Sequence, residues 1–444
     1  MVKKRIVLQG IFWILLYILL ATAPLLLLKI GRVPEGREFW RELSVALGFA
    51  GLSMMTLQFV LTARFKAIKA PYGADIVYHF HRQISLVTFA LIIIHPLLLF
   101  INAPATLELL NLVNAPWRAR MGVTAVFLLI LMIAASLWRK PLKLDYTVWR
   151  IWHGVLAVLV VALSMGHILL VRHYLNLPWK QALWIGYAIF WLGLLFYVRI
   201  LKPILLLRRP YLVDRVIPER GNTWTLVVKP DGHPGMKFIP GQFAWITAWK
   251  SPFTDTEHPF SFSSSANLTS ELAFTIKELG DFSSTIKNMQ PGQKIFIDGP
   301  YGAFSIDRQK HARQYAFIAG GVGITPIMSM LRTLAERKDT RPLVLIYANR
   351  DWESIIFREE LETLKISLNL TLVHVLEKPP TGWIGETGYV NQALLDKYLP
   401  GEKERNYVEV FICGPQPMMN AVETALAKIG VPIGDYHSER FNLV

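Results

Sequence analysis

Six long apolar segments fill the first half of this chain and decide what it can fold into. They span about residues 8–29, 40–62, 76–101, 120–138, 148–171 and 181–201. Each is long enough to cross the roughly 30 Å hydrocarbon core of a bilayer as a helix. Residues 208–444 instead alternate short apolar and polar runs. The sequence therefore predicts a six-helix transmembrane bundle followed by soluble domains, and the hydrophobic fraction of 53% averages the two parts.

Basic residues gather on one side of this bundle. Dense groups precede the first segment, separate the second from the third and the fourth from the fifth, and follow the sixth: Lys3, Lys4, Arg5, Arg64, Lys66, Lys69, Arg139, Lys140, Lys143, Lys202, Arg208 and Arg209. Because cytoplasmic loops are rich in Lys and Arg, we expect a multi-pass cell-membrane protein, in contact with lipid, with both termini in the cytoplasm. The first segment is too long for a signal-peptide core and is expected to remain as a helix. The same distribution argues against nucleic-acid binding, despite a net charge of +15.

Two pairs of histidines lie within the apolar segments. His81 and His95 are in the third segment, and His153 and His167 are in the fifth. Fourteen residues fall ~40° short of four helical turns, so each pair shares one helix face, with partners roughly 21 Å apart. The third and fifth segments cross the bilayer in the same direction, which places His81 opposite His153 and His95 opposite His167. Imidazole is a good iron ligand, and ionisable groups within a span are costly and usually functional. We therefore expect two haems, each held by one histidine pair; a packed histidine bonded to a carbonyl is the alternative for each residue alone.

The soluble half divides into two patterns. Short alternating runs with Gly- and Pro-rich turns over residues 211–302 predict a small antiparallel β-barrel. From residue 314 onward, apolar runs at 315–319, 343–348, 370–376 and 408–412 alternate with helical stretches, which predicts an α/β parallel sheet with crossover helices. The predicted domains are residues 1–207, 208–307 and 308–444.

Two glycine-containing turns follow strands of the predicted parallel sheet. The first, Gly320-Gly321-Val322-Gly323-Ile324-Thr325-Pro326, opens a helix, and the second, Cys413-Gly414-Pro415, precedes a helix containing Met418. Glycine lets the backbone approach a phosphate closely, and the free N–H groups of a helix start attract it. Both turns should fall at the carboxyl edge of the sheet, which predicts a nucleotide site. Cys413 is the single cysteine, which excludes an intramolecular disulfide.

Further motifs complete a known pattern. His258-Pro259-Phe260-Ser261, Gly299-Pro300-Tyr301-Gly302 and the two glycine turns resemble the ferredoxin–NADP reductase module. Together with the six apolar segments and the histidine pairs, nearly the whole chain resembles the NADPH oxidase and ferric reductase superfamily, in a minimal bacterial form. The resemblance implies a ferric reductase-like haem domain, an FAD-binding barrel and an NAD(P)H-binding domain, in that order.

The resemblance also implies roles for single residues of the soluble half. The flavin would be lined by His258, Pro259, Phe260 and Ser261, and the FAD pyrophosphate would be held by Lys277, Gly280, Phe282 and Ser283. Phe441 would stack on the flavin until nicotinamide displaces it, and Glu439 would help to position the nicotinamide. Cys413 would lie near the nicotinamide, with simple packing of a buried strand end as an equal alternative. Arg350 would read the 2′-phosphate of NADPH, although Asp351 follows it and NADH is the alternative.

The implied activity is electron transfer across the membrane. Electrons would pass from cytoplasmic NADPH to FAD, then to an inner haem on His81 and His153, and then to an outer haem on His95 and His167. The acceptor would be oxygen, giving superoxide, or a ferric chelate, giving ferrous iron. A membrane module that reduces a partner protein or quinone is the alternative, although no protein partner is indicated. The outer loops are short and offer only Glu108 and His173 as conspicuous metal ligands, so we expect reduction at the haem edge.

Overall fold

The computed structural model describes residues 2–31, 35–65, 74–254, 256–309, 311–401 and 405–440. The chain divides into two compact units. The first comprises Met1–Ala70 and Ile76–Pro203, and the second comprises Pro71–Asp75 and Ile204–Val444.

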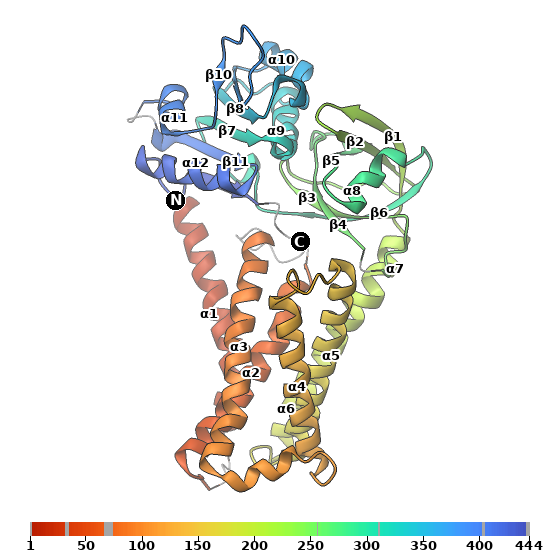
Figure 1. Ribbon diagram of the computed structural model, residues 1–444, viewed down its shortest axis with the longest axis vertical. Coiled ribbons are helices and arrows are strands. Elements are labelled where there is room, and N and C mark those ends of the chain that lie inside the picture. Colours follow the sequence, from red (N-terminus) through yellow and green to blue (C-terminus); the bar gives the residue numbers. More distant parts are fainter. Residues whose placement is uncertain are drawn as a thin grey trace. The chain divides into compact units, whose positions relative to one another are not determined.

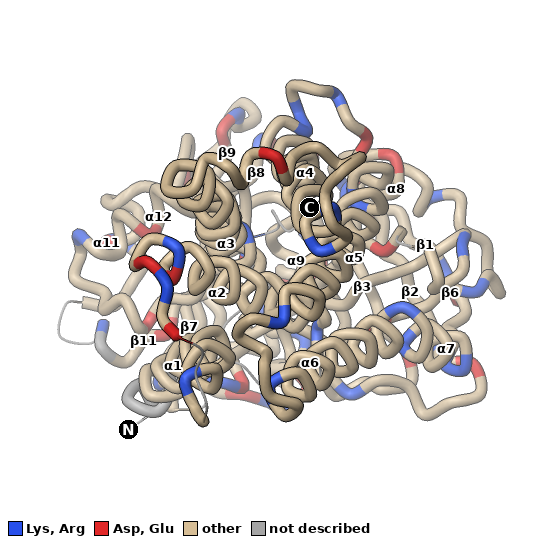
Figure 2. Tube along the Cα trace, turned by 90° about the horizontal axis from the view of Figure 1, so that it is seen from below, with Lys and Arg blue, Asp and Glu red and all other residues tan. Residues whose placement is uncertain are grey.

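Six long helices form the first unit, as the apolar segments predicted. They are α1 (Val2–Leu28), α2 (Phe39–Thr62), α3 (Ala74–Asn102), α4 (Trp117–Leu137), α5 (Tyr146–Val171) and α6 (Pro178–Phe196). All six are long and apolar enough to span a membrane. The helices lie side by side in Figure 1, and their traces are free of charged residues over most of their length in Figure 2. The last helix continues through a π-helical turn, Tyr197–Leu201, into α7 (Lys202–Leu207).

Helix α3 contributes least to the packing of this bundle. In the most apolar 18-residue stretch of each helix, 6% of the residues of α3 are buried, compared with 44% in α2. The shared core is built mainly from α2, α4, α5 and α6, with Phe49, Leu129, Val161 and Trp184 at its centre. The surface of α3 is therefore available to lipid or to a bound group.

An antiparallel barrel begins the second unit. Its strands are β1 (Tyr211–Glu219), β2 (Thr223–Pro230), β3 (Phe243–Ala248), β4 (His258–Ser261), β5 (Leu272–Lys277) and β6 (Lys294–Tyr301). Their order is β4-β3-β6-β1-β2-β5, and Phe262, just after β4, bridges to Phe274 of β5. This bridge joins the two ends of the sheet around a buried core that includes Leu226, Ile246 and Ile297. The predicted barrel is confirmed.

A six-stranded parallel sheet completes the unit. Its strands are β7 (Gln314–Gly320), β8 (Leu343–Asn349), β9 (Leu370–Leu376), β10 (Glu386–Thr387), β11 (Val408–Cys413) and β12 (Tyr436–Glu439), in the order β10-β9-β8-β7-β11-β12. Helices α9 (Ile324–Glu336) and α10 (Arg358–Ser367) contribute to the core on one face, and α11 (Gln392–Tyr398) and α12 (Gln416–Lys428) to that on the other. The order reverses between β7 and β11, and ligands of such sheets bind outside the strand ends at that point.

Candidate functional site

His95 and His167 face each other between α3 and α5. Their ring centroids lie 6.4 Å apart, with the ring planes at 65°. Two imidazoles that share one metal have centroids about 6 Å apart, taking ~2 Å for each metal–nitrogen bond and ~1 Å from nitrogen to ring centre. The observed separation therefore fits coordination of one iron between these two rings.

The second nitrogen of each of these rings is held by the protein. His95 Nδ1 lies 2.8 Å from the carbonyl oxygen of Ser44 and 2.9 Å from its Oγ, and His167 Nδ1 lies 2.7 Å from the carbonyl oxygen of Arg118. A carbonyl accepts a hydrogen bond, so Nδ1 must donate, and Nε2 keeps the lone pair that a metal needs. Such second partners fix the tautomer and ring orientation of ligating histidines.

The Nδ1 atoms of the other predicted pair, His81 and His153, also have protein partners. His81 Nδ1 lies 2.8 Å from Oε1 of Gln58, and His153 Nδ1 lies 3.3 Å from Oγ of Ser136. The Ser136 hydroxyl also accepts a hydrogen bond from Nε1 of Trp149, at 3.3 Å. In all four predicted ligands Nδ1 therefore has a protein partner, which suits coordination through Nε2. No cluster of three or more His, Cys, Asp or Glu side chains that could hold a metal ion occurs among the described residues.

Two helix glycines give the imidazoles of His167 and His95 room. A Cβ atom at Gly122 of α4 would lie 2.8 Å from Nδ1 of His167, and one at Gly48 of α2 would lie 3.3 Å from the ring of His95. Sequence reasoning missed both glycines, as well as the partners Ser44, Gln58 and Ser136. The signal that could have revealed these residues is the presence of a polar or very small residue inside an apolar span. A polar group within the membrane costs free energy and usually has a function there.

The predicted flavin residues come together on the barrel. The ring of His258 stacks on Phe282 of α8 (Asp281–Thr285), with centroids 4.1 Å apart and planes at 21°. The ring of Phe260 is also nearly parallel to the ring of Phe282, with centroids 5.9 Å apart. Pro259 pairs with Trp245 of β3, and Ser261 is buried at the end of β4. The His-Pro-Phe-Ser strand and α8 thus form one aromatic surface that suits a flat ring system.

The predicted pyrophosphate residues divide into two kinds. Ser283 Oγ accepts hydrogen bonds from the backbone N–H groups of Leu279 and Gly280, each at 2.9 Å, and donates one to the carbonyl oxygen of Gly280 at 3.0 Å. This hydroxyl therefore orders the turn before α8. Lys277, at the end of β5, forms no ion pair with any residue that the structure describes, so its ammonium group is available to an anion.

The two glycine turns meet where the sheet order reverses, as predicted. A Cβ atom at Gly323 would lie 2.2 Å from the carbonyl oxygen of Cys413, and one at Gly320 would lie 2.7 Å from the sulfur of Met418 and 2.8 Å from Cδ of Pro415. Glycine is required at these positions because the turns touch. Gly321, by contrast, has φ +52° and open space where a side chain would be. The half-buried backbone at Gly321 therefore has open space beside it for a phosphate.

The residues expected around the nicotinamide lie beside these turns. Cys413 pairs with Glu439 across β11 and β12, and Oε1 of Glu439 lies 3.3 Å from the Cβ position of Gly302, which follows β6 of the barrel. Complete burial raises the pKa of the Cys413 thiol well above its usual value, and the neighbouring Glu439 adds to the effect. The thiol is thus protonated, and packing describes its role better than nucleophilic chemistry. Phe441 lies outside the described residues.

Arg350 is an exposed cation at the carboxyl end of β8. It makes no ion pair with any residue in the described part of the chain. The carboxylate of Asp351 instead accepts a hydrogen bond from the backbone N–H of Ser354, at 2.9 Å, and caps the short helix Trp352–Ser354. The guanidinium of Arg350 is therefore available to a ligand at this strand end, whereas one oxygen of the Asp351 carboxylate serves as a helix cap.

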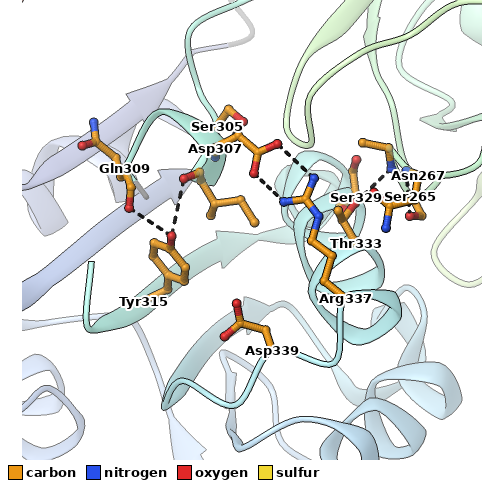
Figure 3. A network of polar contacts seen from close by, with 12 residues as sticks. Ser265, Asn267, Ser305, Asp307, Gln309, Tyr315, Ser329, Thr333, Arg337 and Asp339 are labelled. Atoms are coloured by element: carbon orange, nitrogen blue, oxygen red, sulfur yellow. Dashed lines mark hydrogen bonds and ion pairs between the residues drawn. The ribbon is translucent and has the colours of Figure 1, made fainter. Parts of the chain in front are cut away.

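Helix α9, which follows the glycine turn at residues 320–326, forms hydrogen bonds to the segment after β4 of the barrel. Arg332 donates to the carbonyl oxygen of Ser263 at 2.6 Å, and Thr333 Oγ accepts from the backbone N–H of Ala266 at 2.9 Å. Figure 3 shows this contact region, with Arg337 directed at the carboxylate of Asp307. The segment after β4 is thus anchored on the helix that the 320–326 turn opens, and the two sites are held in a defined arrangement.

Three family models match the chain in the order of its parts. They are the ferric reductase like transmembrane component at residues 47–164, the FAD-binding domain at 215–305, and the oxidoreductase NAD-binding domain at 317–424. Together the matches cover more than half of the sequence. The chain belongs to the NADPH oxidase and ferric reductase superfamily. It is a multi-pass membrane oxidoreductase with FAD- and NAD(P)H-binding domains.

Individual relatives match about a third to a half of this superfamily member. NADH-cytochrome b5 reductase 1 of Pyricularia oryzae is 36% identical over 155 residues, which is 34% of this chain and 49% of that protein. The glycine betaine monooxygenase reductase subunit of Pseudomonas aeruginosa is 32% identical over 234 residues, 51% of this chain and 62% of that one. The chain thus matches about half to two thirds of the length of these relatives. A solved flavohemoglobin from Malassezia yamatoensis aligns with 91% of this chain and 99% of its own, with TM-score 0.50 and 17% identity, a likeness of fold alone.

Proposed function

We propose that this protein moves electrons from cytoplasmic NADPH, through FAD and two b-type haems, to a small-molecule acceptor across the membrane. The acceptor is oxygen, reduced to superoxide, or a ferric chelate, reduced to ferrous iron. When bound, FAD accepts two electrons as a hydride and releases them one at a time to haem irons that carry single electrons. The chain's own contribution is to bind, space and insulate these groups.

The facing imidazoles of His95 and His167 are the observation that supports the proposal most strongly. Their separation of 6.4 Å suits a metal between them, and carbonyl groups hold both Nδ1 atoms. Gly122 and Gly48 keep neighbouring helices clear of both rings. His81 and His153, with Gln58 and Ser136 as partners, would hold the second haem on the cytoplasmic side.

The soluble half supports NADPH as the donor. Arg350 is unpaired among the described residues, whereas Asp351 is occupied as a helix cap. A guanidinium at the end of the second strand of such a sheet favours the 2′-phosphate that distinguishes NADPH from NADH. Lys277 would bind the FAD pyrophosphate, and Ser283 would keep the turn around it in shape.

Anaerobic spectroscopy of the purified protein tests this function. NADPH should bleach the flavin band and then produce the reduced spectra of both haems. Oxygen and ferric citrate are then added to separate samples, and the one that reoxidises the haems is the acceptor. Reduced haems that neither compound oxidises would favour a partner protein or quinone, and haems that NADPH never reduces would contradict the proposal.

A further inference from the structure

An exposed aromatic loop follows strand β3 of the barrel. All residues of the strand, Phe243–Ala248, are buried, but Trp249 and Phe253 in the loop at residues 249–254 are 50% and 47% exposed. Lys250 lies between these two aromatic residues, is exposed, and forms no ion pair with any residue that the structure describes. Large aromatic side chains release much free energy when they are buried, so a loop that exposes two of them suits a partner surface.

The loop has a defined conformation. Trp249 has φ +64°, in the left-handed region that bulky residues rarely adopt. Its Nε1 donates a hydrogen bond to Oγ1 of Thr285, at the end of α8, at 3.1 Å. Farther along the loop, the backbone N–H of Thr254 donates to the carbonyl oxygen of Ser251 at 3.0 Å and closes a turn. Because the one polar atom of the indole already has a partner, the exposed part of the Trp249 side chain is apolar.

Strand register places this loop at the end of the barrel that the last transmembrane helix enters. The apolar span that includes α6 ends at Leu207, and β1 begins four residues later at Tyr211. Tyr211 pairs with Ile295 of β6, and Ile295 pairs with Ala248 at the end of β3. At ~4.8 Å between neighbouring strands, Tyr211 and Ala248 are about 10 Å apart. The aromatic loop, which begins directly after Ala248, therefore leaves the barrel beside the connection to the membrane.

The connection between the span and the barrel is short and is bound to the barrel. Only residues 208–210 lie between the two elements, and at ~3.3–3.6 Å per residue the four steps from the span to β1 reach at most about 14 Å. The carbonyl oxygen of Pro210 accepts a hydrogen bond from Nε2 of His233 at 2.8 Å, and Arg209 donates to the carbonyl oxygen of Gly235 at 3.1 Å. This end of the barrel is therefore held close to the surface of the membrane.

We infer that the loop at residues 249–254 binds the interface of the lipid bilayer, with the side chains of Trp249 and Phe253 inserted among the headgroups. The occupant is lipid because the short connection keeps this end of the barrel next to a membrane. Aromatic rings are enriched at membrane interfaces, and an ammonium group such as that of Lys250 can extend from there to lipid phosphates. The inference rests on the multi-pass membrane location and is independent of the electron donor and acceptor.

Such an anchor would also position the predicted flavin surface. Strand β4 begins at His258, four residues after the end of the loop, and Trp249 is bonded to α8, which carries Phe282. His258 and Phe282 are the two stacked rings of that surface. A loop held in the bilayer interface therefore fixes the distance of the flavin surface from the membrane.

Depth-dependent fluorescence quenching tests the inference on the full-length, FAD-loaded protein in phosphatidylcholine nanodiscs. Bimane is attached to the Phe253→Cys variant and, as the matched control, to Ile366→Cys, a residue of α10 that is 88% exposed. An interfacial group lies about 5–10 Å deep, so lipids with a nitroxide near the top of the acyl chain should remove roughly half or more of the emission at position 253. The same lipids should leave the emission at position 366 unchanged. Wild-type protein treated with bimane gives the background from Cys413.

A second variant and a second quencher complete the test. Adding Trp249→Ser to the labelled Phe253→Cys variant removes half of the aromatic anchor, so quenching by the nitroxide lipids should fall at least ~2-fold. The FAD content of each variant shows that the barrel is folded. If aqueous iodide quenches the label at position 253 and the lipids do not, the loop lies in water and the inference is wrong. A label that neither quencher reaches would show that the loop packs against protein, which would also overturn the inference.

Discussion

The Nδ1 atom of His167 lies 2.7 Å from the carbonyl oxygen of Arg118, one turn before Gly122 on α4. Helix α4 thus touches this imidazole twice, once through a carbonyl that orients it and once through a residue without a side chain. The arrangement explains how an apolar span can hold a polar ring in one orientation.

Gly122→Ala should weaken the outer haem site selectively. The added methyl group would lie 2.8 Å from Nδ1 of His167 and displace the ring from its carbonyl partner. Loss of such a second partner typically costs 10–100-fold in metal affinity, so we expect loss of one haem of the two. Haem content and the low-spin spectrum of the purified protein measure the effect. Gly186→Ala in α6 is the control, because no atom lies within 4 Å of its Cβ position; equal haem loss in both variants would contradict the assignment.

Arg332→Gln should slow hydride transfer without removing haem. Arg332 joins the carbonyl oxygen of Ser263 to Glu360, and its loss loosens the segment after the His-Pro-Phe-Ser strand. Hydrogen bonds to charged groups contribute about 1.5–3 kcal/mol, so we expect a lower unfolding midpoint of the soluble unit and slower flavin reduction in stopped flow. Lys365→Gln, which removes an exposed ion pair with Glu362, should change neither quantity. An unaltered flavin reduction rate in Arg332→Gln would show that the contact does not align the two sites.

Arg350→Gln should change the preference between the two nucleotides. Removal of the guanidinium takes away a charge-assisted partner for the 2′-phosphate, which is expected to raise the KM for NADPH about 10-fold. The KM for NADH should stay the same, since NADH has no 2′-phosphate. Steady-state rates at varied concentrations of each nucleotide measure both KM values. A similar rise in both values would mean that Arg350 acts on the fold of the strand end and does not recognise the phosphate.

Cys413 should resist alkylation in the folded protein. Burial raises its pKa, and because the thiolate is the reactive form, reaction requires a higher pH than for an ordinary cysteine. We expect labelling by N-ethylmaleimide at pH 7 to be at least ~100-fold slower than in denaturant, with a rate that increases as pH rises. Rapid labelling of the native protein at pH 7 would show that the strand end opens to solvent.

The elements that lie along one helix or strand were readable from the sequence. The spacing of His81 and His95 sets their shared face by helical geometry alone. The two glycine turns could be placed at one edge of the sheet because each follows a parallel strand. Ser44, Gln58 and Gly122 were not readable, because they meet the histidines from other helices, and the rotation of a helix among its neighbours leaves no clear pattern in an apolar span. Likewise, the hydrogen bonds of the Ser283 hydroxyl to the backbone of its own turn were not foreseen, and its role beside a phosphate stays a prediction.

Strands β10 and β12 also went unpredicted. They have two and four residues, and all four positions of β12 are only half-buried. Short edge strands lack the apolar run that marks a strand inside a sheet. Their existence depends on neighbours β9 and β11, which become known only once the sheet is assembled.

The haem content of three preparations tests the central assignment most directly. A pyridine haemochrome assay should find two haems per chain in the wild type, one in His95→Ala and one in His81→Ala, with the remaining haem still reducible by NADPH in His95→Ala. Reduction should stop in His81→Ala, where the haem nearest the flavin is missing. A folded wild-type protein without haem, or variants that keep both haems, would contradict the account.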